Sequence, residues 1–468
     1  MFTQRLAEFV ADTAINDIPA AALERSRHAI VDTVGCALAG TLEPVAEQAS
    51  QWLTEIGARP QATVWGSALR SSPADAAFAN GIASHALDFD DSLLSMRGHP
   101  STALVPAALA VGEATHASGA AVLAAYTLGL DVAGKLGRAV GQAHYLRGWH
   151  TSATVGVFSA TAAAARLWGL KARQLQVAFG LAASQASGLV RNFGTMTKPF
   201  HAGHAARSGV MAAWMASHGF TADATIFDGK DGFLFTYGGG DGEPTDDLAA
   251  QLGKPWEALE PGIYVKRWPC CYCNHRPIGG LLKLIAEHGI RAEEVTAVDV
   301  GFLPGSDTAL ISTNPQTGLE GKFSIEYVAA ATLLDGRLTL ETFTDPMVQR
   351  SKIRELMSRV RRSRIAATGT YSGTVGYSTV VVDTTRGRFE TRVEQTPGSP
   401  AWPMSDADRV EKFMDCAGRA LGVPGAQKLL DLLLSCGSLP DIGVLVKATV
   451  PATGDSHAEQ GRARMQAQ

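Results

Sequence analysis

Histidine, lysine and arginine side chains stand at four apparent helix starts in this sequence. His99 precedes a Pro-Ser pair and His150 precedes a Thr-Ser pair, while Lys198 and Arg276 each stand immediately before a proline. A proline fits the first turn of a helix, because its missing N–H would be unpaired there anyway. The free N–H groups and the dipole of a helix N-terminus favour an anion. These positions predict a site for a polyanionic small molecule, provided that the fold brings the helix ends together.

Three carboxylates lie just upstream of His99, in the stretch HALDFDDSLLSMRGHP at 85–100. Clustered carboxylates suit a hard cation. We nevertheless expect no metal, because Asp88, Asp90 and Asp91 form a single cluster and no second one is evident. Asp88 is expected instead to orient a histidine or a lysine, as a third group fixes the tautomer of an imidazole.

Three of the six cysteines crowd into the segment KRWPCCYCNHRPI at 266–278. With His275 they suggest zinc, but the spacing lacks the second, distant ligand pair of a zinc site. We expect a packed cluster of reduced thiols. Lys266, His275 and Arg276 are candidate binding groups, since an arginine can hold a carboxylate through two hydrogen bonds.

The elements that must position these groups are mostly helical up to residue 265. Segments 72–86, 101–133 and 151–168 are rich in alanine, which is the best helix former and lets helices approach closely. From 266 the pattern changes. VTAVDVGF at 295–302 alternates as a strand does, VGYSTVVVDT and RFETRVEQ flank a Thr-Arg-Gly turn as a hairpin does, and helices are predicted at 323–336 and 345–362.

The predicted fold is therefore mainly α, with a large all-helical domain and a smaller α+β domain. The helical domain is expected over 1–265 and the α+β domain over 266–398. Segment 399–468 is expected to send its helices back to the helical domain and to end in a disordered polar tail, GDSHAEQGRARMQAQ.

Composition excludes several classes of protein from the prediction. The net charge is −4 without a basic tract, so we expect no nucleic-acid partner. No stretch reaches the 18 apolar residues of a membrane span, so we expect no membrane partner. The N-terminus lacks the apolar core of a signal peptide and carries Glu8 and Asp12, and the cysteines do not form a disulfide framework. A cytoplasmic location is the expectation.

Several stretches resemble the MmgE/PrpD family, which includes 2-methylcitrate dehydratases, cis-aconitate decarboxylases and an iminodisuccinate epimerase. They run in the family's order from about residue 85 to 340. The matching pieces are HALDFDDS, GHPSTALVPAALA, GWHTSATVGVFSATAAAARLWGL, GTMTKPFHAGHAARSGVMAAWMA, KRWPCCYCNHRPI and FSIEYVAAATLLDG. The resemblance implies a helical domain built from both chain ends, a smaller α+β domain, a homodimer, and neither metal nor organic cofactor.

The resemblance also implies which residues form the active site. Carried over from the decarboxylase branch, they are Asp88, Ser92, His99, His150, Lys198 and Tyr327. Ser92 stands where many relatives have threonine, which keeps the hydroxyl. Thr102-Ala103 stand where 2-methylcitrate dehydratases have Asp-Asn, which weakens the methylcitrate interpretation and leaves decarboxylase-like and epimerase-like members open.

The chemistry implied is proton transfer at a carbon next to a carboxylate, with cations and N–H donors stabilising the enolate-like transition state. His99 is expected to be the general base or acid, because histidine titrates near neutral pH. His150 is expected to donate a proton to a leaving hydroxyl or on the opposite face. Lys198 either pairs with a substrate carboxylate or acts as an acid with a lowered pKa. Tyr327 is expected to donate its phenolic hydrogen to a substrate oxygen, and Ser92 to do the same.

We therefore predict a cofactor-independent lyase that dehydrates or decarboxylates a small di- or tricarboxylate by His/Lys acid–base chemistry. An epimerase of a dicarboxylate such as iminodisuccinate is the alternative, since the same two histidines would exchange one proton between opposite faces. A non-catalytic helical binding protein is a second alternative, but it predicts missing catalytic groups. His201 and His204, three residues apart on a predicted helix, line the pocket or cap its edge.

Overall fold

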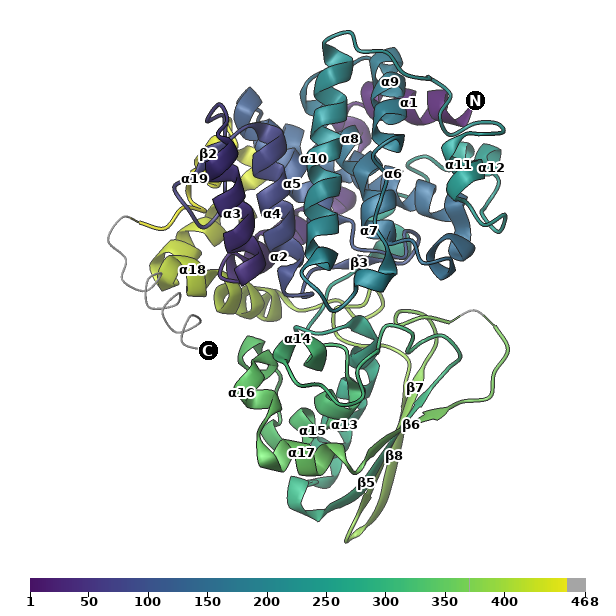
Figure 1. Cartoon of the computed structure of the whole chain (residues 1–468), viewed down its shortest axis with the longest axis vertical. Helices are drawn as coiled ribbons and strands as arrows, with labels where there is room; N and C mark the ends of the chain where they lie inside the picture. The colour runs from purple at the N-terminus through teal and green to yellow at the C-terminus, as the bar shows by residue number, and fades with distance from the viewer. Residues whose placement is uncertain (370, 453–468) are drawn as a thin grey trace. The chain divides into compact units, whose positions relative to one another are not determined.

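The computed structural model describes residues 1–369 and 371–452 of the chain (Figure 1). The tail predicted to be disordered, 454–468, lies outside the described residues. The chain divides into two compact units. The first comprises Met1–Ile263 and the segment that begins at Asp406, and the second comprises Tyr264–Ser405.

The first unit is a bundle of helices, so the mainly-α prediction is confirmed. Strands β1 (Ala62–Thr63) and β2 (Arg70–Ser71) pair antiparallel, so the domain that was predicted to be all-helical also contains a small sheet. The short strand β3 (Ser92–Leu93) follows the carboxylate cluster. Its helices are α1 (Phe2–Asp12), α2 (Ala20–Gly40), α3 (Pro44–Ile56), α4 (Pro73–Ala86), α5 (Ser101–Thr115), α6 (Gly119–Leu146), α7 (Thr151–Thr154), α8 (Gly156–Leu167), α9 (Ala172–Ala183), α10 (Thr197–Ser217), α11 (Phe233–Tyr237), α12 (Thr245–Ala250), α18 (Asp406–Leu434) and α19 (Gly443–Lys447).

Helix α10 lies against both α4 and α8, and small residues allow the close approach. At the crossing with α4, a Cβ on Gly81 would lie 2.8 Å from the Cα of Gly203, which is closer than a real Cβ contact. A Cβ on Gly203 would lie 2.4 Å from the carbonyl oxygen of Phe78. The crossing therefore depends on glycine at both positions, and it brings the end of α4 to the start of α10.

Helix α6 is long and apolar enough to cross a membrane by length and composition alone. However, 89% of its most apolar window is buried inside the protein, as in the core helix of a globular domain. Two charged residues of α6, Asp131 and Lys135, are also buried and paired: Lys135 Nζ lies 2.9 Å from Glu257 Oε1 and 3.7 Å from Asp131 Oδ1.

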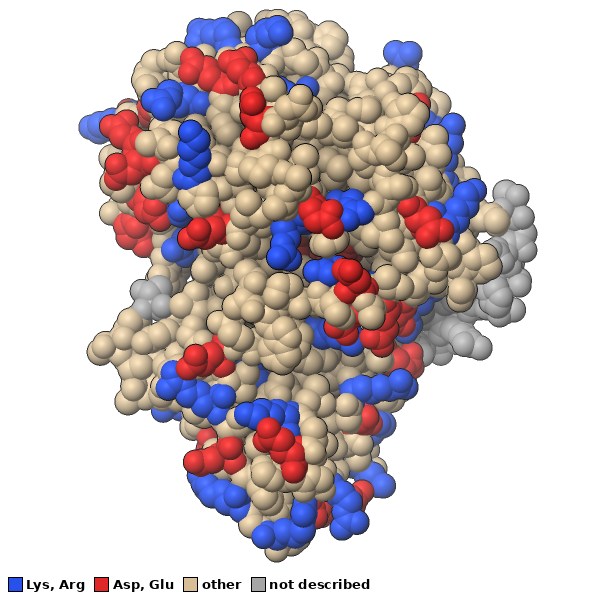
Figure 2. Space-filling view, turned by 180° about the vertical axis from the view of Figure 1, so that it is seen from behind, with Lys and Arg blue, Asp and Glu red and all other residues tan. Residues whose placement is uncertain are grey.

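On the face that Figure 2 shows, Lys and Arg side chains alternate with Asp and Glu rather than gathering by sign.

The second unit contains a four-stranded sheet in the order β6-β5-β7-β8, with α13 and α15 packed against it (Figure 1). Strands β5 and β6 are parallel and the other pairs are antiparallel. The predicted strand at 295–302 and the predicted hairpin are confirmed. The elements are β5 (Val295–Phe302), β6 (Val360–Arg364), β7 (Ser378–Thr384), β8 (Gly387–Val393), α13 (His275–His288), α14 (Gly318–Gly321), α15 (Ile325–Asp335), α16 (Asp345–Val348) and α17 (Ser351–Met357), with β4 (Ile263–Tyr264) at the junction of the units.

The prediction of one helix over 345–362 is wrong. Helices α16 and α17 end at Met357, and the following residues form the edge strand β6. Val360 is buried, and the Arg362 guanidinium contacts Glu326 at 2.8 Å. Backbone pairing with β5 overrides the helix propensity of the arginines, which is a tertiary effect that local pattern does not contain.

Helix α18 packs along α2 and carries a buried cation, Lys412. Its Nζ lies 2.6 Å from Asp32 Oδ1 on α2 and donates to the Phe89 carbonyl oxygen at 2.9 Å. The same ammonium lies 4.0 Å from the centre of the Phe89 ring. Since Phe89 stands between Asp88 and Asp90, the C-terminal segment holds the loop that carries the carboxylate cluster.

Replacing Lys412 with methionine is expected to lower the free energy of unfolding by about 3–5 kcal/mol, because the buried Asp32 carboxylate loses its counter-charge. Urea denaturation measures this. The matched control is Arg419→Met on the same helix, whose ion pair with Asp415 is solvent-exposed and should change stability by less than about 1 kcal/mol. Equal, small effects of both substitutions would contradict the assigned role of Lys412.

Candidate functional site

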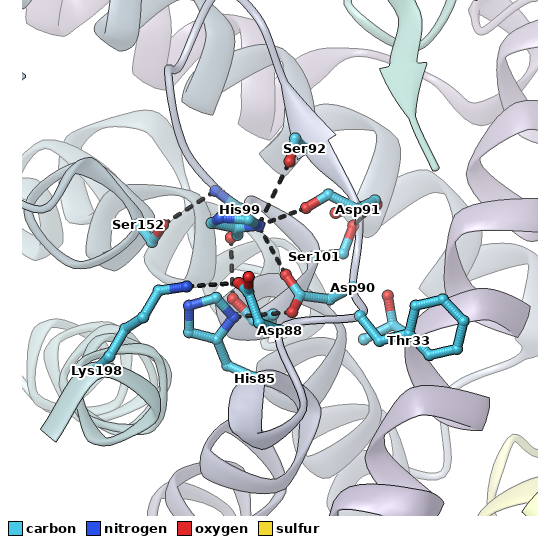
Figure 3. A network of polar contacts seen from close by, with 12 residues as sticks. Thr33, His85, Asp88, Asp90, Asp91, Ser92, His99, Ser101, Ser152 and Lys198 are labelled. Atoms are coloured by element: carbon cyan, nitrogen blue, oxygen red, sulfur yellow. Dashed lines mark hydrogen bonds and ion pairs between the residues drawn. The ribbon is translucent and has the colours of Figure 1, made fainter. Parts of the chain in front are cut away.

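Three of the four predicted helix starts meet around the loop between α4 and α5. Figure 3 shows His99 and Lys198 there, and the ring of His150 lies 5.9 Å from that of His85, centre to centre. His99 and His150 stand just before α5 and α7, as predicted. Lys198 lies inside the first turn of α10 rather than before it. Arg276 lies in the first turn of α13, in the second unit. The predicted convergence is therefore found within the first unit for two histidines and one lysine.

The loop leaves α4 through a left-handed residue, Asp88, whose φ is +52°. Aspartate tolerates this region better than most residues, because its short polar side chain bonds locally. The turn directs the Asp88 carboxylate to the ammonium of Lys198, with which it forms a buried ion pair. Lys198 Nζ also lies 5.1 Å from the centre of the Phe193 ring. Asp88 is thus paired with Lys198, and its expected role in orienting a histidine or a lysine stays a prediction.

The Asp90 carboxylate lies between two imidazoles (Figure 3). Its Oδ1 lies 2.8 Å from Nδ1 of His85, and its Oδ2 lies 2.9 Å from Nδ1 of His99. The His99 Nδ1 also lies 2.7 Å from the carbonyl oxygen of Asp91. Because all of these partners accept hydrogen bonds, Nδ1 carries the proton in both rings. The lone pair of each neutral ring is therefore at Nε2.

His99 also has contacts with α7 through its backbone and with Ser92 through its ring. Its backbone N–H donates to Ser152 Oγ at 3.0 Å. Ser92 Oγ lies 3.5 Å from His99 Nδ1, at the edge of hydrogen-bond distance. With 17% of its side chain exposed, His99 is the least buried of the site histidines His85, His99 and His150. It is therefore positioned to meet a small molecule.

Asp91 differs from the other two carboxylates because it is neutralised by a proton. Its Oδ2 accepts a hydrogen bond from Ser101 Oγ at 2.5 Å, and Ser101 contacts the Tyr126 hydroxyl at 2.7 Å. Burial raises the pKa of Asp91 to about 8. The three acidic residues therefore have three different partners: an ammonium, two imidazoles, and a proton with a hydroxyl.

His150 contacts a second histidine that the sequence placed only near the pocket. Nδ1 of His150 lies 3.1 Å from Nδ1 of His201, so one ring donates and the other accepts. Burial lowers the pKa of His201 to about 4 and, with His85, Lys198 and His201 nearby, holds the pKa of His150 well below its ordinary value. Nε2 of His150 is buried without a hydrogen-bond partner in the described part of the chain.

The charges of this cluster constrain its ligand. Lys198 is already paired with Asp88, and the buried histidines are neutral at pH 7. A polycarboxylate therefore needs further positive charge, from protons taken up by the imidazoles or from other cations. The predicted binding cations, Lys266 and Arg276, belong to the second unit.

A metal ion is the other source of positive charge. Ligand atoms of His85, Asp88, Asp90 and His99 all lie within 4.8 Å of one another, so these four residues could hold an ion. A cation at that position competes with the Lys198 ammonium for Asp88. The prediction of a metal-free site therefore keeps a physical basis, and it remains to be tested.

The predicted residues of the second unit have other partners there. The guanidinium of Arg276 donates to the carbonyl oxygens of Glu394 at 3.0 Å and Gly373 at 2.8 Å. The His275 ring stacks on Tyr272 with 4.6 Å between centres, and Lys266 is fully buried.

Tyr327 lies in the core of the second unit, where its hydroxyl donates to the Thr342 carbonyl. Roles in binding for Lys266, His275 and Arg276, and in catalysis for Tyr327, stay predictions. The neighbouring cysteines form no disulfide among the described residues, in agreement with the expected reduced thiols.

Sequence reasoning missed His85 and the bridging position of Asp90. His85 stands in the last turn of α4, three residues before Asp88, so it belongs to the same short stretch as the carboxylates. The sequence signal that could have revealed this contact is the spacing of five residues between His85 and Asp90. Local spacing did not reveal the contact, because the loop reverses direction at Asp88.

Comparisons with known proteins cover nearly the whole chain. The MmgE/PrpD N-terminal domain matches residues 4–244, and the MmgE/PrpD C-terminal domain matches residues 268–435. The cis-aconitate decarboxylase of Homo sapiens is 28% identical over 454 residues, which cover 95% of this chain and 93% of that protein. The cis-aconitate decarboxylase of Aspergillus terreus is 26% identical over 467 residues, with 95% of each chain covered.

The raised pKa of Asp91 predicts how stability changes with pH. The folded protein keeps the Asp91 proton up to about pH 8, whereas the unfolded chain loses it near pH 4. Asp91 therefore contributes stability that is lost as pH rises through 8, with a slope of up to about 1.4 kcal/mol per pH unit. The buried histidines give a slope of the opposite sign near pH 6.5, where the imidazoles of the unfolded chain titrate, so the contribution of Asp91 is the difference between the wild type and an Asp91 variant.

Replacing Asp91 with asparagine should remove this slope, since asparagine mimics the protonated acid. Urea unfolding of both proteins at pH 6.5, 7.25 and 8 measures the difference. If the free energies of unfolding of the two proteins stay parallel across this window, Asp91 is ionised in the folded state.

Proposed function

This chain belongs to the MmgE/PrpD family, as its motifs predicted, and we propose that it is a cofactor-independent lyase for a small tricarboxylate. Decarboxylation of a cis-aconitate-like acid is the first candidate reaction. The support is the similarity to cis-aconitate decarboxylases over 95% of the chain, together with the site of the first unit. Dehydration of a 2-hydroxy acid is the second candidate within the same class.

The observation that carries the proposal is the arrangement of His99, His150 and Lys198 around one buried loop. Decarboxylation breaks the bond between a carbon and a carboxylate, and the electron pair moves into the neighbouring double bond. The resulting carbanion is stabilised as an enolate by the remaining carboxylates and must receive a proton at carbon. An imidazole and an ammonium at the same place supply the proton and the positive charge.

His99 suits the proton transfer because its tautomer is fixed. The Asp91 carbonyl accepts the hydrogen bond from Nδ1–H, and Asp90 Oδ2 lies 2.9 Å from the same nitrogen, so Nε2 is the nitrogen that accepts or delivers the proton. His150 becomes an acid only when its pKa rises, and a bound polyanion raises it by adding negative charge beside the ring. We infer that substrate binding is accompanied by proton uptake.

The proposal is tested first in D₂O by proton NMR, with 2-methylcitrate, citrate, cis-aconitate and iminodisuccinate supplied separately. Loss of CO₂ or water from one acid is expected, and Lys198→Met should lower kcat at least about 100-fold because the transition-state charge loses its cation. The matched control is the surface substitution Lys171→Met, which should leave kcat unchanged. Activity after dialysis against a chelator tests whether a metal is required.

Other outcomes of this experiment assign other functions. Deuterium at a stereocentre with no loss of mass would replace the lyase with an epimerase, in which two bases exchange one proton. Full activity of Lys198→Met on the true substrate would reject the site. No reaction with any of the four acids would reject the proposed substrate class.

We also propose that the protein is a homodimer through the face formed by α3 and α10. Trp52, Phe200 and Trp214 are 38%, 42% and 49% exposed there, which is unusual for large apolar side chains on a free surface. Trp52 and Phe200 both pack edge-on against Phe78, and Arg207 lies 5.0 Å from the Trp52 ring. The face is thus rigid and aromatic, as interface cores are.

Light scattering after size-exclusion chromatography should give twice the chain mass for the wild type. Trp214→Glu should give a monomer, because it places a charge in the apolar face. The control is Trp402→Glu, which alters a similarly exposed tryptophan of the second unit and should stay dimeric. A monomeric wild type would reject the dimer, and a dimeric Trp214→Glu would reject this face.

A further inference from the structure

His85 is a buried histidine that the proposed reaction does not use. Only 1% of the residue is exposed, and its ring centre lies 4.7 Å from that of His99 and 5.9 Å from that of His150. One ring nitrogen, Nδ1, contacts Asp90 Oδ1 at 2.8 Å. The other, Nε2, is buried without a hydrogen-bond partner among the described residues.

Another buried histidine of the same unit shows what a structural role looks like. Nδ1 of His144 lies 2.8 Å from the Tyr237 carbonyl oxygen, and Nε2 lies 2.8 Å from Thr154 Oγ1. Both nitrogens are thus satisfied by groups of the protein, as is usual for buried polar atoms. His85 leaves one nitrogen unsatisfied, and all of its close polar neighbours belong to the candidate site.

We propose that His85 is a positioning residue of the active site, because its Nδ1–H donates to one oxygen of Asp90 while the other oxygen lies 2.9 Å from Nδ1 of His99. The two imidazoles then share one carboxylate. This inference rests on the proposed function, but it concerns His85 and its hydrogen bond to Asp90, to which the proposed function assigns no role.

The shared carboxylate sets both the orientation and the basicity of His99. A donor on Oδ1 fixes the rotation of the Asp90 side chain, so Oδ2 stays directed at His99. The same donor withdraws electron density from Asp90, which limits how strongly Asp90 stabilises the protonated form of His99. Without His85, the carboxylate holds a proton on His99 more strongly, and His99 remains protonated to higher pH.

The surroundings of His85 keep it in the donor state that this role requires. It faces Asp90 on the loop, His99 before α5, His150 before α7, and the Lys198–Asp88 ion pair at the start of α10. Burial lowers the pKa of His85 to about 4, and Lys198 and His99 act in the same direction. The ring is therefore neutral at pH 7, with its proton at Nδ1 and a lone pair at Nε2.

Two substitutions separate the donor role from space filling. His85→Asn keeps an N–H near the position of Nδ1, whereas His85→Gln places its amide near the position of Nε2 and loses the bond to Asp90. Proton–nitrogen NMR of protein labelled with [¹⁵N]histidine, recorded without any substrate, reports the tautomer and the titration of His99. The expected result is an unchanged His99 titration in His85→Asn and a midpoint raised by roughly one pH unit in His85→Gln.

Once a substrate is established, the pH dependence of steady-state kinetics gives a second test. In His85→Gln the acidic limb of kcat/KM should move to higher pH by the same amount, with kcat lowered about 10- to 100-fold and KM little changed. His85→Asn should restore the wild-type limb. The control is His144→Gln, which disturbs a buried histidine of the same unit and should leave the limb in place.

The outcomes keep this inference separate from the proposed function. If His85 of the wild type carries its proton at Nε2, or if the asparagine and glutamine variants titrate identically, His85 is not the positioning residue. If the NMR result is as expected but none of the four acids reacts, the function is wrong and the shared carboxylate stands.

Discussion

Three carboxylates buried within four residues are the constraint on which the first unit depends. A buried charge is costly unless it is paired, and each of these acids is compensated differently. Asp88 pairs with an ammonium from α10, Asp90 accepts a hydrogen bond from one imidazole and lies beside a second, and Asp91, whose pKa is raised to about 8, accepts a hydrogen bond from Ser101. Helices far apart in the chain must therefore end at one place, and the glycine crossing between α4 and α10 is part of what brings them there.

The burial that makes this cluster energetically costly also makes the protonation of its groups sensitive to a bound anion. A cluster in which burial holds His85, His150 and His201 neutral is poised to change protonation when an anion arrives. The same property is of little value to a purely structural core, where satisfied groups such as His144 are preferred. The electrostatics therefore support the proposed acid–base chemistry on a carboxylate.

Much of the fold was readable from the sequence, because alanine-rich helices and alternating strands have strong local patterns. His99 and His150 were placed correctly at helix starts, because the Pro-Ser and Thr-Ser pairs that follow them are local signals of a helix N-terminus. The failures were non-local. The segment 345–362 gave way to strand β6 through pairing with β5, and His85 was overlooked because its partner Asp90 is reached only after the chain reverses at Asp88. The roles of Lys266, His275 and Arg276 likewise depend on tertiary structure, which cannot be derived from the spacing of residues in the sequence.

The ammonium that Lys412 supplies to the loop has a consequence for the order of assembly. A ribosome that has just completed α10 has made every acid–base residue of the first unit, but the cation that holds Asp32 and the Phe89 carbonyl is still to be synthesised, after the entire second unit. The contacts of Lys412 with Asp32 and Phe89 can therefore form only after the second unit has been synthesised. The inserted unit thus sets a delay between synthesis of the site residues and closure of the segment that holds their loop.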